Sequence, residues 1–349
     1  MVREVRLSSD FSGLDTVAWA FKYLGLPHRN VAACDINKAS LQVLQHLEPE
    51  WLGSDVRQRQ IDRMPPSDLH SFGAPCQSYS KSGKRARNEC ELGQLANYAI
   101  DYIEHHKPRM ILMEQVPDIV SSEDYLLELL ARLSRSGYSV NMQVLKSSDY
   151  GLPQERCRLY VIGIQRPVVE FLFPPPIPCP PLLSFVDVLP ASEFKVLPEK
   201  GPRGGSTRLD NVSRHLQACV EEGVNPFERS VIITSGCSAS RCNRMVDRCV
   251  TITRTEAQRQ GLWCSTKGGF LDFDEMARLQ GFWTGFLPWQ DLGISDPQFG
   301  GLLGNAMSLN VVLNLIPPLL RSAGFVTENE FRKLAERARR YHPKTCRPD

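Results

Sequence analysis

The first 47 residues constrain the fold of this chain more than any other stretch. Alternating polar and apolar residues predict a strand over Glu4–Ser8, and a turn containing Gly13 follows it. Apolar residues at helical spacing predict a helix over Thr16–Leu24. A second apolar run over Asn30–Asp35 leads into a second helix over Lys38–Leu47. Strand, glycine turn, helix, strand and acid are the layout of a nucleoside-cofactor site in a parallel α/β sheet.

Two acidic residues stand where predicted strands leave this sheet. Asp35 ends the second apolar run, and Asp55 stands next to Val56 where a third strand would end. Acids at the carboxyl ends of parallel strands suit hydrogen bonds to a nucleoside. Asp35 has an alternative use, because Asp is also a common helix N-cap. The turn is not the G-x-G-x-x-G pattern, so its one glycine is by itself a weak signal.

The segment Gly73–Lys84 places one cysteine behind a rigid proline at a probable strand end. Pro75 fixes its own φ and favours an extended Ala74, so the chain approaches Cys76 on a defined path. The polar, basic residues after Cys76 bury little apolar area, which indicates a loop. A thiol on a rigid edge beside a basic loop suits a nucleophile that acts on an anionic polymer. The alternative is a small buried hydrophobe, as free cysteines often are.

Three further charged residues lie at predicted strand ends. Glu114 directly follows the apolar run 110–113, which places it at the edge of the sheet, although a surface acid at a strand end is the commoner case. Arg156 and Arg158 begin another predicted strand and, with a period of two, point to the same face. Two adjacent guanidiniums need acceptors, so we expect either a ligand or an internal carboxylate opposite them. Structural salt bridges are the alternative.

Composition narrows the class of protein but does not identify a partner. The chain has 349 residues, 42% of them hydrophobic and 23% charged, which is ordinary for a globular protein of one large and one smaller domain. It has neither a run of about 18 apolar residues nor the apolar core of a signal peptide. Eleven scattered cysteines without C-x-x-C pairs indicate reduced thiols in an intracellular protein, and no zinc site. The net charge of +2 neither demands nor excludes nucleic acid.

The second half of the chain is harder to interpret. A proline-rich linker is expected over Phe171–Pro181, followed by irregular structure to about residue 247. This stretch offers either phosphate contacts or a solvated face through Arg203, Arg208, Arg214, Arg229, Arg241 and Arg244. A strand is expected over Arg248–Arg254, a glycine-rich turn over Gly300–Ala306, and a capping box at Thr327–Glu330.

Taken in order, these motifs resemble those of the cytosine-5 DNA methyltransferases over nearly the full length of the chain. The matching segments are Phe11-Ser12-Gly13, Asp35-Ile36, Asp55, Pro75-Cys76-Gln77, Glu114-Gln115-Val116, the Gln-x-Arg-x-Arg run Gln154–Arg158, Arg248–Thr253 and Gly304-Asn305-Ala306. Each match is weak alone. Together, in the order and rough spacing of the family, they are specific and favour the functional interpretations over the alternatives.

The resemblance implies a Rossmann-like S-adenosylmethionine-dependent methyltransferase domain over residues 1–172, completed by 298–349. It implies a smaller, irregular target-recognition domain over 173–297. The implied cofactor is S-adenosylmethionine, with S-adenosylhomocysteine as product, and the implied partner is double-stranded DNA, with no membrane and no metal. The implied cofactor residues are Phe11, Ser12, Gly13, Leu14, Asp35, Ile36, Asp55, Val56, Pro75, Asn305 and Ala306. DNA contacts are expected from Gln77, Ser80, Lys81, Lys84, Arg85, Arg241 and Arg244.

The resemblance also implies a mechanism. Cys76 would add to C6 of a flipped-out cytosine, Glu114 would hold the N3 edge of the ring, and Arg158 would face O2 with support from Arg156. The chain begins at the first predicted strand, as expected of a bacterial enzyme or a bare catalytic fragment. An intracellular location is expected, in the nucleus of a eukaryote or the cytoplasm and nucleoid of a bacterium.

The chain departs from the family pattern in its cofactor turn, where Asp15 and Thr16 replace the usual glycines, and at Gln115, where Asn is usual. Asp15 would crowd the methionine end of the cofactor or hydrogen-bond its amino group. Two other functions remain open. A branch of the family methylates transfer RNA, and Trp263–Gly268 faintly resembles one of its elements. A catalytically silent scaffold is the other, although intact Cys76 and Glu114 argue against it.

Overall fold

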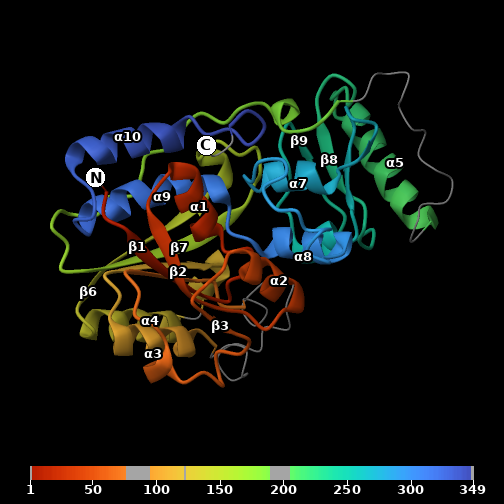
Figure 1. The fold of residues 1–349 in the computed structure, drawn as a ribbon. Coiled ribbons are helices and arrows are strands. Elements are labelled where there is room, and N and C mark those ends of the chain that lie inside the picture. Colours follow the sequence, from red (N-terminus) through yellow and green to blue (C-terminus); the bar gives the residue numbers. More distant parts are fainter. Residues whose placement is uncertain (1, 76–94, 122, 189–204, 347–349) are drawn as a thin grey trace.

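The computed structural model describes residues 2–75, 95–121, 123–188 and 205–346 (Figure 1). The strands are β1 (Val5–Asp10), β2 (His28–Cys34), β3 (Trp51–Gly53), β4 (Leu69–Phe72), β5 (Met110–Gln115), β6 (Tyr138–Lys146), β7 (Cys157–Gln165), β8 (Val231–Thr234), β9 (Arg244–Val246), β10 (Leu262–Cys264) and β11 (Gly269–Phe270). The helices are α1 (Thr16–Leu24), α2 (Lys38–His46), α3 (Leu95–His106), α4 (Glu123–Arg135), α5 (Gly205–Glu221), α6 (Arg254–Gln258), α7 (Phe273–Leu279), α8 (Asp296–Asn305), α9 (Leu309–Ser322) and α10 (Glu328–Arg339).

The core of the fold is a seven-stranded sheet in the order β3-β2-β1-β4-β5-β7-β6. All neighbours pair in parallel except those of β7, which runs antiparallel to both β5 and β6. The chain moves outward from β1 to β3 and then returns to the other side of β1 to form β4. The order therefore reverses between β1 and β4, and ligands of open α/β sheets bind at such a switch point, beyond the carboxyl ends of the strands.

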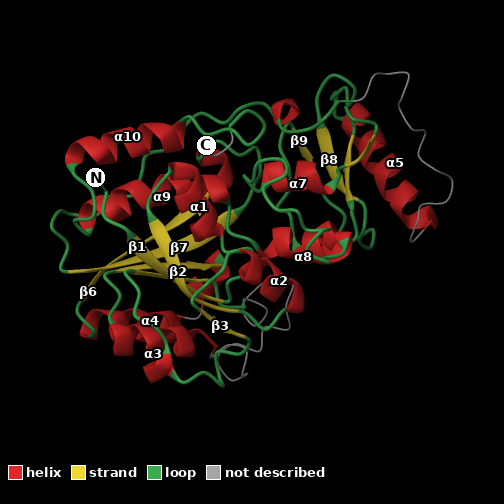
Figure 2. Cartoon of the chain, viewed as in Figure 1, coloured by secondary structure: helices red, strands yellow, loops and turns green. Residues whose placement is uncertain are grey.

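Helices cover both faces of this sheet. In Figures 1 and 2, α1, α9 and α10 lie on one face, and α3 and α4 lie on the other. The larger apolar core joins α1, α9 and the sheet through residues such as Trp19, Leu112 and Leu313, which are all buried. A second core lies under α3 and α4. The C-terminal helices thus complete the layer that α1 begins, as the prediction for residues 298–349 requires, but the domain boundaries themselves stay a prediction.

The second half of the chain is more regular than the sequence indicated. A four-stranded sheet in the order β11-β10-β8-β9 stands beside the large sheet in Figure 2, with α5 packed on it. The expectation of irregular structure to residue 247 is therefore wrong over α5, β8 and β9. Most residues of α5 are polar, and only a narrow side of the helix is apolar. Val212 and Cys219 on that side are buried against Val231 and Ile233 of β8.

Two other expectations about this half are wrong. The segment Arg248–Arg254 is not a strand, because its only ladder contact is a bridge from Cys249 to Gln154, and Arg254 already begins α6. The glycines expected in a turn lie in α8. A Cβ at Gly300 would lie 2.5 Å from the carbonyl oxygen of Ala257, and one at Gly304 would lie 2.4 Å from the backbone nitrogen of Arg254. These glycines allow two helices to approach closely, and do not break the chain.

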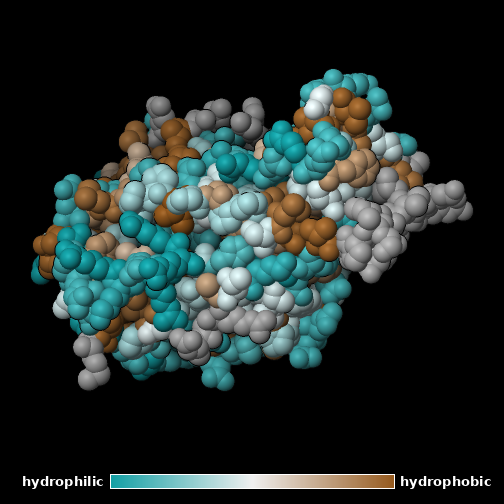
Figure 3. All heavy atoms as spheres, turned by 90° about the horizontal axis from the view of Figure 1, so that it is seen from above, coloured by the Kyte–Doolittle hydropathy of each residue, from teal (hydrophilic) through white to brown (hydrophobic). Residues whose placement is uncertain are grey.

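Most predicted elements of the first half are confirmed, and α1 has the predicted bounds. The capping box at Thr327 and Glu330 opens α10 as expected. No single described helix is long and apolar enough to cross a membrane. The pair α8 and α9 reaches that length and composition, but it is bent by 44° and most of its residues are buried. The face seen in Figure 3 mixes apolar and polar side chains.

Candidate active site at the carboxyl edge of the large sheet

A cavity of about 540 Å³ opens at the switch point between β1 and β4. Its walls come from the turns after β1, β2, β3 and β4, from the end of β5, from the start of β7 and from the end of α8. All the residues that the sequence suggested for a cofactor line it, namely Phe11, Ser12, Gly13, Leu14, Asp35, Ile36, Asp55, Val56, Pro75, Asn305 and Ala306. The cavity also reaches Glu114, Arg156 and Arg158. The large sheet therefore gathers the two predicted sets of residues in one place.

The turn after β1 is held by the acid that follows β2. Phe11 and Gly13 have positive φ values of 52° and 56°, a conformation that favours glycine at the second position. The amide of Gly13 donates to Asp35 Oδ2 at 2.8 Å, and the amide of Asn37 donates to Asp35 Oδ1 at 2.8 Å. Asp35 is not the N-cap of α2, because Asn37 fills that role. The alternative use of Asp35 as a helix cap is therefore wrong.

The side chains next to Asp35 offer an apolar surface and a second acid. Ile36 is 70% exposed, which is unusual for an isoleucine and leaves an apolar face bare in the cavity wall. Asp55 accepts hydrogen bonds from Arg57 Nη2 at 2.8 Å and from the Arg57 amide at 2.9 Å. Hydrogen bonding from Arg57 lowers the pKa of Asp55. The fixed position of Asp55 thus depends on a nearby arginine that the sequence analysis did not single out.

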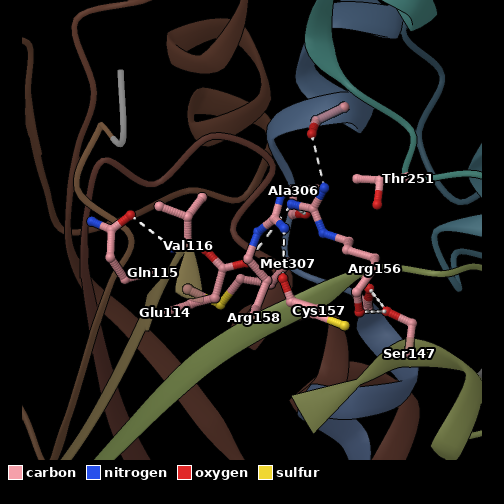
Figure 4. A network of polar contacts seen from close by, with 12 residues as sticks. Glu114, Gln115, Val116, Ser147, Arg156, Cys157, Arg158, Thr251, Ala306 and Met307 are labelled. Carbon is pink, nitrogen blue, oxygen red and sulfur yellow. Dashed lines mark hydrogen bonds and ion pairs between the residues drawn. The ribbon is translucent and has the colours of Figure 1, made fainter. Parts of the chain in front are cut away.

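Glu114 lies at the end of β5 and faces both predicted arginines (Figure 4). Its Oε1 atom lies 3.3 Å from Nε of Arg158 and 3.7 Å from Nη2 of Arg156. Glu114 is 8% exposed, and Oε1 is buried without a hydrogen bond. Of the two partners expected for the arginines, a ligand or an internal carboxylate, the structure provides the carboxylate.

The two arginines have different surroundings. Arg156 is buried and donates to the carbonyl oxygens of Gly304 at 3.3 Å and Ala306 at 2.8 Å. Arg158 donates to the carbonyl oxygen of Cys157, and its side chain stays 17% exposed on the cavity side. Arg156 therefore ties the end of α8 to the sheet, whereas Arg158 is placed to meet a ligand. That Arg156 supports Arg158 stays a prediction.

Two connecting glutamines, Gln154 and Gln280, escaped the sequence analysis, whereas Gln115 stands where support of the local backbone was expected. Gln115 donates to the carbonyl oxygen of Ala74 at 3.1 Å, so it holds the backbone just before Pro75. Gln154 is fully buried and donates to the carbonyl oxygen of Leu279, while its own oxygen accepts from the amide of Ile252. The side chain of Gln280 donates to Ala306 in turn. Glutamines carry no pattern that marks them as connectors, so the sequence contained no signal for the roles of Gln154 and Gln280 beyond the motif around Gln154.

A buried charged group at the end of β1 was also missed. Asp10 lines the cavity and pairs with Arg59, and its Oδ2 atom lies 3.4 Å from Nε2 of His70. Arg59 donates further to the carbonyl oxygen of Tyr98 in α3. Burial disfavours the charge of Asp10, but the contacts with His70 and Arg59 outweigh it and lower its pKa. This group fixes the segment after β3 against the end of β1.

Other predicted residues lie outside the described part of the chain or away from the cavity. Cys76, Gln77, Ser80, Lys81, Lys84 and Arg85 lie outside the described residues, as does Arg203. Arg244 in β9 pairs with Glu222 and contacts His215 at 3.1 Å, so its charge is already partnered, whereas Arg241 is exposed. Cys264, in the segment compared with the transfer-RNA branch, is a fully buried residue of β10. Its position is explained by packing.

The cavity fits S-adenosylmethionine by the chemistry of its walls. The carboxylate of Asp35 suits the hydroxyl donors of a ribose, and exposed Ile36 suits a flat apolar ring. A sheet covered on both faces, with its ligand cavity at this switch point, is the layout of the Rossmann-like, doubly wound α/β folds that bind nucleoside cofactors.

Comparison with known proteins gives the family. The model of the C-5 cytosine-specific DNA methylases matches residues 5–319, and the chain belongs to that family. The Type II methyltransferase M.NlaX of Neisseria lactamica is 31% identical over 170 residues, which cover 48% of this chain and 54% of the relative. The orphan methyltransferase M.Rho11sI of Bacillus phage rho11s is 27% identical over 172 residues, which cover 48% of this chain and 34% of the relative. The chain thus spans about half or less of the length of these relatives.

Solved structures agree on the fold. The methyltransferase EhMeth of Entamoeba histolytica superposes with a TM-score of 0.62 at 16% identity, covering 91% of this chain and 98% of that one. The Dnmt2 methyltransferase of S. pombe superposes with a TM-score of 0.59 at 15% identity, covering 90% and 98%. At these identities the likeness shows the fold alone.

Proposed function

We propose that the protein transfers a methyl group from S-adenosylmethionine to C5 of cytosine in double-stranded DNA. The observation that supports this most is the pairing of Glu114 with Arg156 and Arg158 in the cavity that the predicted cofactor residues also line. Pro75, which directly precedes Cys76, lines the same cavity. A carboxylate and a guanidinium held side by side match the N3 and O2 edge of a cytosine.

The residues divide the chemistry as follows. The thiolate of Cys76 adds to C6 of the ring, which makes C5 an enamine carbon that can attack an electrophilic methyl group. Glu114 holds the N3 and amino edge and shares a proton with N3 as charge develops there, and Arg158 stabilises the charge on O2. S-adenosylmethionine supplies the methyl group as an electrophile when it is bound. A base then removes the C5 proton, the C6–sulfur bond breaks, and Cys76 is restored.

The chain would hold the cofactor with the residues of the turns after β1, β2 and β3. Asp35 accepts from the ribose hydroxyls, Ile36 packs against the adenine, and Asp55 accepts from the adenine amino group. The target base must leave the stacked duplex to reach Glu114, which costs a few kcal/mol. DNA as the substrate places the protein inside the cell, in the nucleus of a eukaryote or the nucleoid of a bacterium.

Methylation assays test the substrate. The purified full chain is incubated with the cofactor and either duplex DNA or transfer RNA, and bisulfite sequencing locates the modified cytosines. We expect C5-methylcytosine in the duplex, in a fixed sequence context. Modification of transfer RNA alone would favour the transfer-RNA branch, and modification of neither would favour the scaffold.

Covalent trapping tests the mechanism. Duplex DNA with 5-fluorocytosine at the target site should form a stable adduct, because the C5 fluorine cannot leave as a proton does. Cys76→Ala should form no adduct and lose methyl transfer while it still binds S-adenosylhomocysteine. Cys157→Ala, which removes an exposed thiol next to Arg158, should still form the adduct and serves as the matched control. Full turnover by Cys76→Ala would refute the mechanism.

A further inference from the structure

Asp15 is an unusual residue for the start of a helix that borders a ligand cavity. It is the N-cap of α1 and has φ 51° and ψ 61°, in the left-handed region that residues other than glycine seldom adopt. It is 8% exposed and lines the cavity. A strained, buried acid at a ligand site suggests a role in that site.

The carboxylate of Asp15 has few partners. Its Oδ2 atom accepts from the hydroxyl of Ser9 at 2.9 Å, and Oδ1 accepts a long hydrogen bond of 3.4 Å from the amide of Ala18. Within the described residues, no lysine, arginine or histidine nitrogen lies within ion-pair distance of it. Burial raises the pKa of Asp15, and the hydrogen bonds from Ser9 and Ala18 only partly oppose that effect. Among the described residues, Asp15 is thus a buried carboxylate without a cationic partner.

The other carboxylates of the cavity are better satisfied. Asp10, Asp55 and Glu114 each face an arginine. Asp35 lacks a cation, but each of its oxygens accepts a backbone amide at 2.8 Å. Of these carboxylates, Asp15 would therefore add most to the binding free energy of a cation.

The proposed cofactor carries its positive charges in one half of the molecule, and that half could pair with the carboxylate of Asp15. Its nucleoside half is neutral, whereas its amino-acid half carries the sulfonium and the ammonium group. An ammonium group has N–H donors that can form charge-assisted hydrogen bonds with a carboxylate, and a sulfonium has none. We propose that Asp15 binds the ammonium group of the cofactor, an inference that rests on the proposed function. Because related chains usually have glycine here, this contact would distinguish the cofactor site of this chain.

Three ligands separate this proposal from its alternatives. S-adenosylhomocysteine has the ammonium group and an uncharged sulfur, S-adenosylmethionine has both charges, and 5′-methylthioadenosine has neither. Isothermal titration calorimetry gives the dissociation constant of each ligand for the wild type, Asp15→Asn and Asp15→Gly. Both variants suit the left-handed backbone of residue 15, so both are expected to fold.

Both variants should bind S-adenosylhomocysteine and S-adenosylmethionine about 10- to 100-fold more weakly, as expected for the loss of a hydrogen bond between charged groups. Their affinity for 5′-methylthioadenosine should be unchanged. Asp35→Asn serves as the control, because it should weaken all three ligands, which share the ribose.

Other outcomes would overturn the inference. Unchanged affinity of Asp15→Asn for S-adenosylhomocysteine would do so, and so would equal losses for all three ligands. A loss seen with S-adenosylmethionine but not with S-adenosylhomocysteine would assign Asp15 to the sulfonium and not to the ammonium group. If the wild type bound none of the ligands, the proposed function itself would fail, and this inference would fail with it.

Discussion

The carboxylates of the cavity differ in whether a cation faces them. At the β5 end, Glu114 faces Arg156 and Arg158, and at the end of β1 Asp10 faces Arg59. At the α1 end, Asp15 and Asp35 face no cation among the described residues. The pKa of Asp10 is lowered because His70 and Arg59 outweigh its burial. Burial raises the pKa of Asp15 and Asp35, and it is opposed mainly by hydrogen bonds, with a smaller electrostatic contribution from His28 at Asp15.

This difference separates two tasks within one site. A carboxylate that already has its arginine is charged and fixed before any ligand arrives, which suits a group that must act on a developing charge. A buried carboxylate without a cation is costly in the free protein, and that cost is relieved only when a ligand supplies donors or charge. We therefore interpret Asp10 and Glu114 as framework and chemistry, and Asp15 and Asp35 as ligand contacts. Asp55 is the exception, because it pairs with Arg57 and is also proposed to contact the cofactor.

Replacing Glu114 should have the largest effect. Glu114→Gln keeps the shape of the side chain but removes its charge, so we expect kcat to fall about 100- to 1000-fold. The dissociation constant of S-adenosylhomocysteine should stay unchanged. Glu155→Gln is the matched control, because Glu155 also faces two cations, Lys146 and Arg248, but does not line the cavity. Equal losses in both variants would remove the distinction between paired acids that act and paired acids that only support.

Replacing Asp10 should reduce stability. Asp10→Asn leaves the buried guanidinium of Arg59 without its carboxylate, so the free energy of unfolding should fall by about 3 kcal/mol at pH 7. Because the pKa of Asp10 is lowered in the folded state, its contribution is present at neutral pH and is lost only as the pH falls through that lowered value. The difference between wild type and variant should therefore shrink only in acid.

Urea denaturation at pH 7 and at successively lower pH values measures the effect of Asp10→Asn on the free energy of unfolding. The control is Asp62→Asn, since the Asp62 side chain is 88% exposed and should leave stability unchanged. A neutral or stabilising effect of Asp10→Asn at pH 7 would show that the pairing with Arg59 does not stabilise the fold.

Replacing Asp15 should have the smallest effect on stability, and its sign should be opposite to that of replacing Asp10. In the absence of ligand, Asp15→Asn should raise the free energy of unfolding by about 1 kcal/mol at pH 7, the size of a typical stabilising substitution. The raised pKa means that the wild type gains stability as the pH falls from the folded-state pKa towards the unfolded-state value. The advantage of the variant should accordingly disappear below about pH 4. A destabilised variant at neutral pH would mean that the charge of Asp15 is already compensated in the free protein.

The accuracy of the sequence-based prediction differs between the two halves of the chain. The bounds of α1 follow from a run of apolar residues that ends at Gly25, which are local features. The helix α5 was missed because only a narrow side of it is apolar, and the sequence does not show that this side is buried against β8. Similarly, Gly300 and Gly304 suggested a turn, since nothing in the sequence shows that α6 approaches them closely.

The sequence alone determined the order of the elements in the first half of the chain, the turn that follows β1 and the residue types that line the cavity. Only the tertiary structure decided which acids receive a cation. Asp10 and Arg59 are 49 positions apart, and they meet because the strand order brings the segment after β3 back to the end of β1. Asp15 and Ser9 are close in sequence, but Asp15 is a candidate ligand contact because it is buried and faces no arginine among the described residues. Spacing along a chain fixes local geometry, whereas the pairing of buried charges depends on segments that only folding brings together.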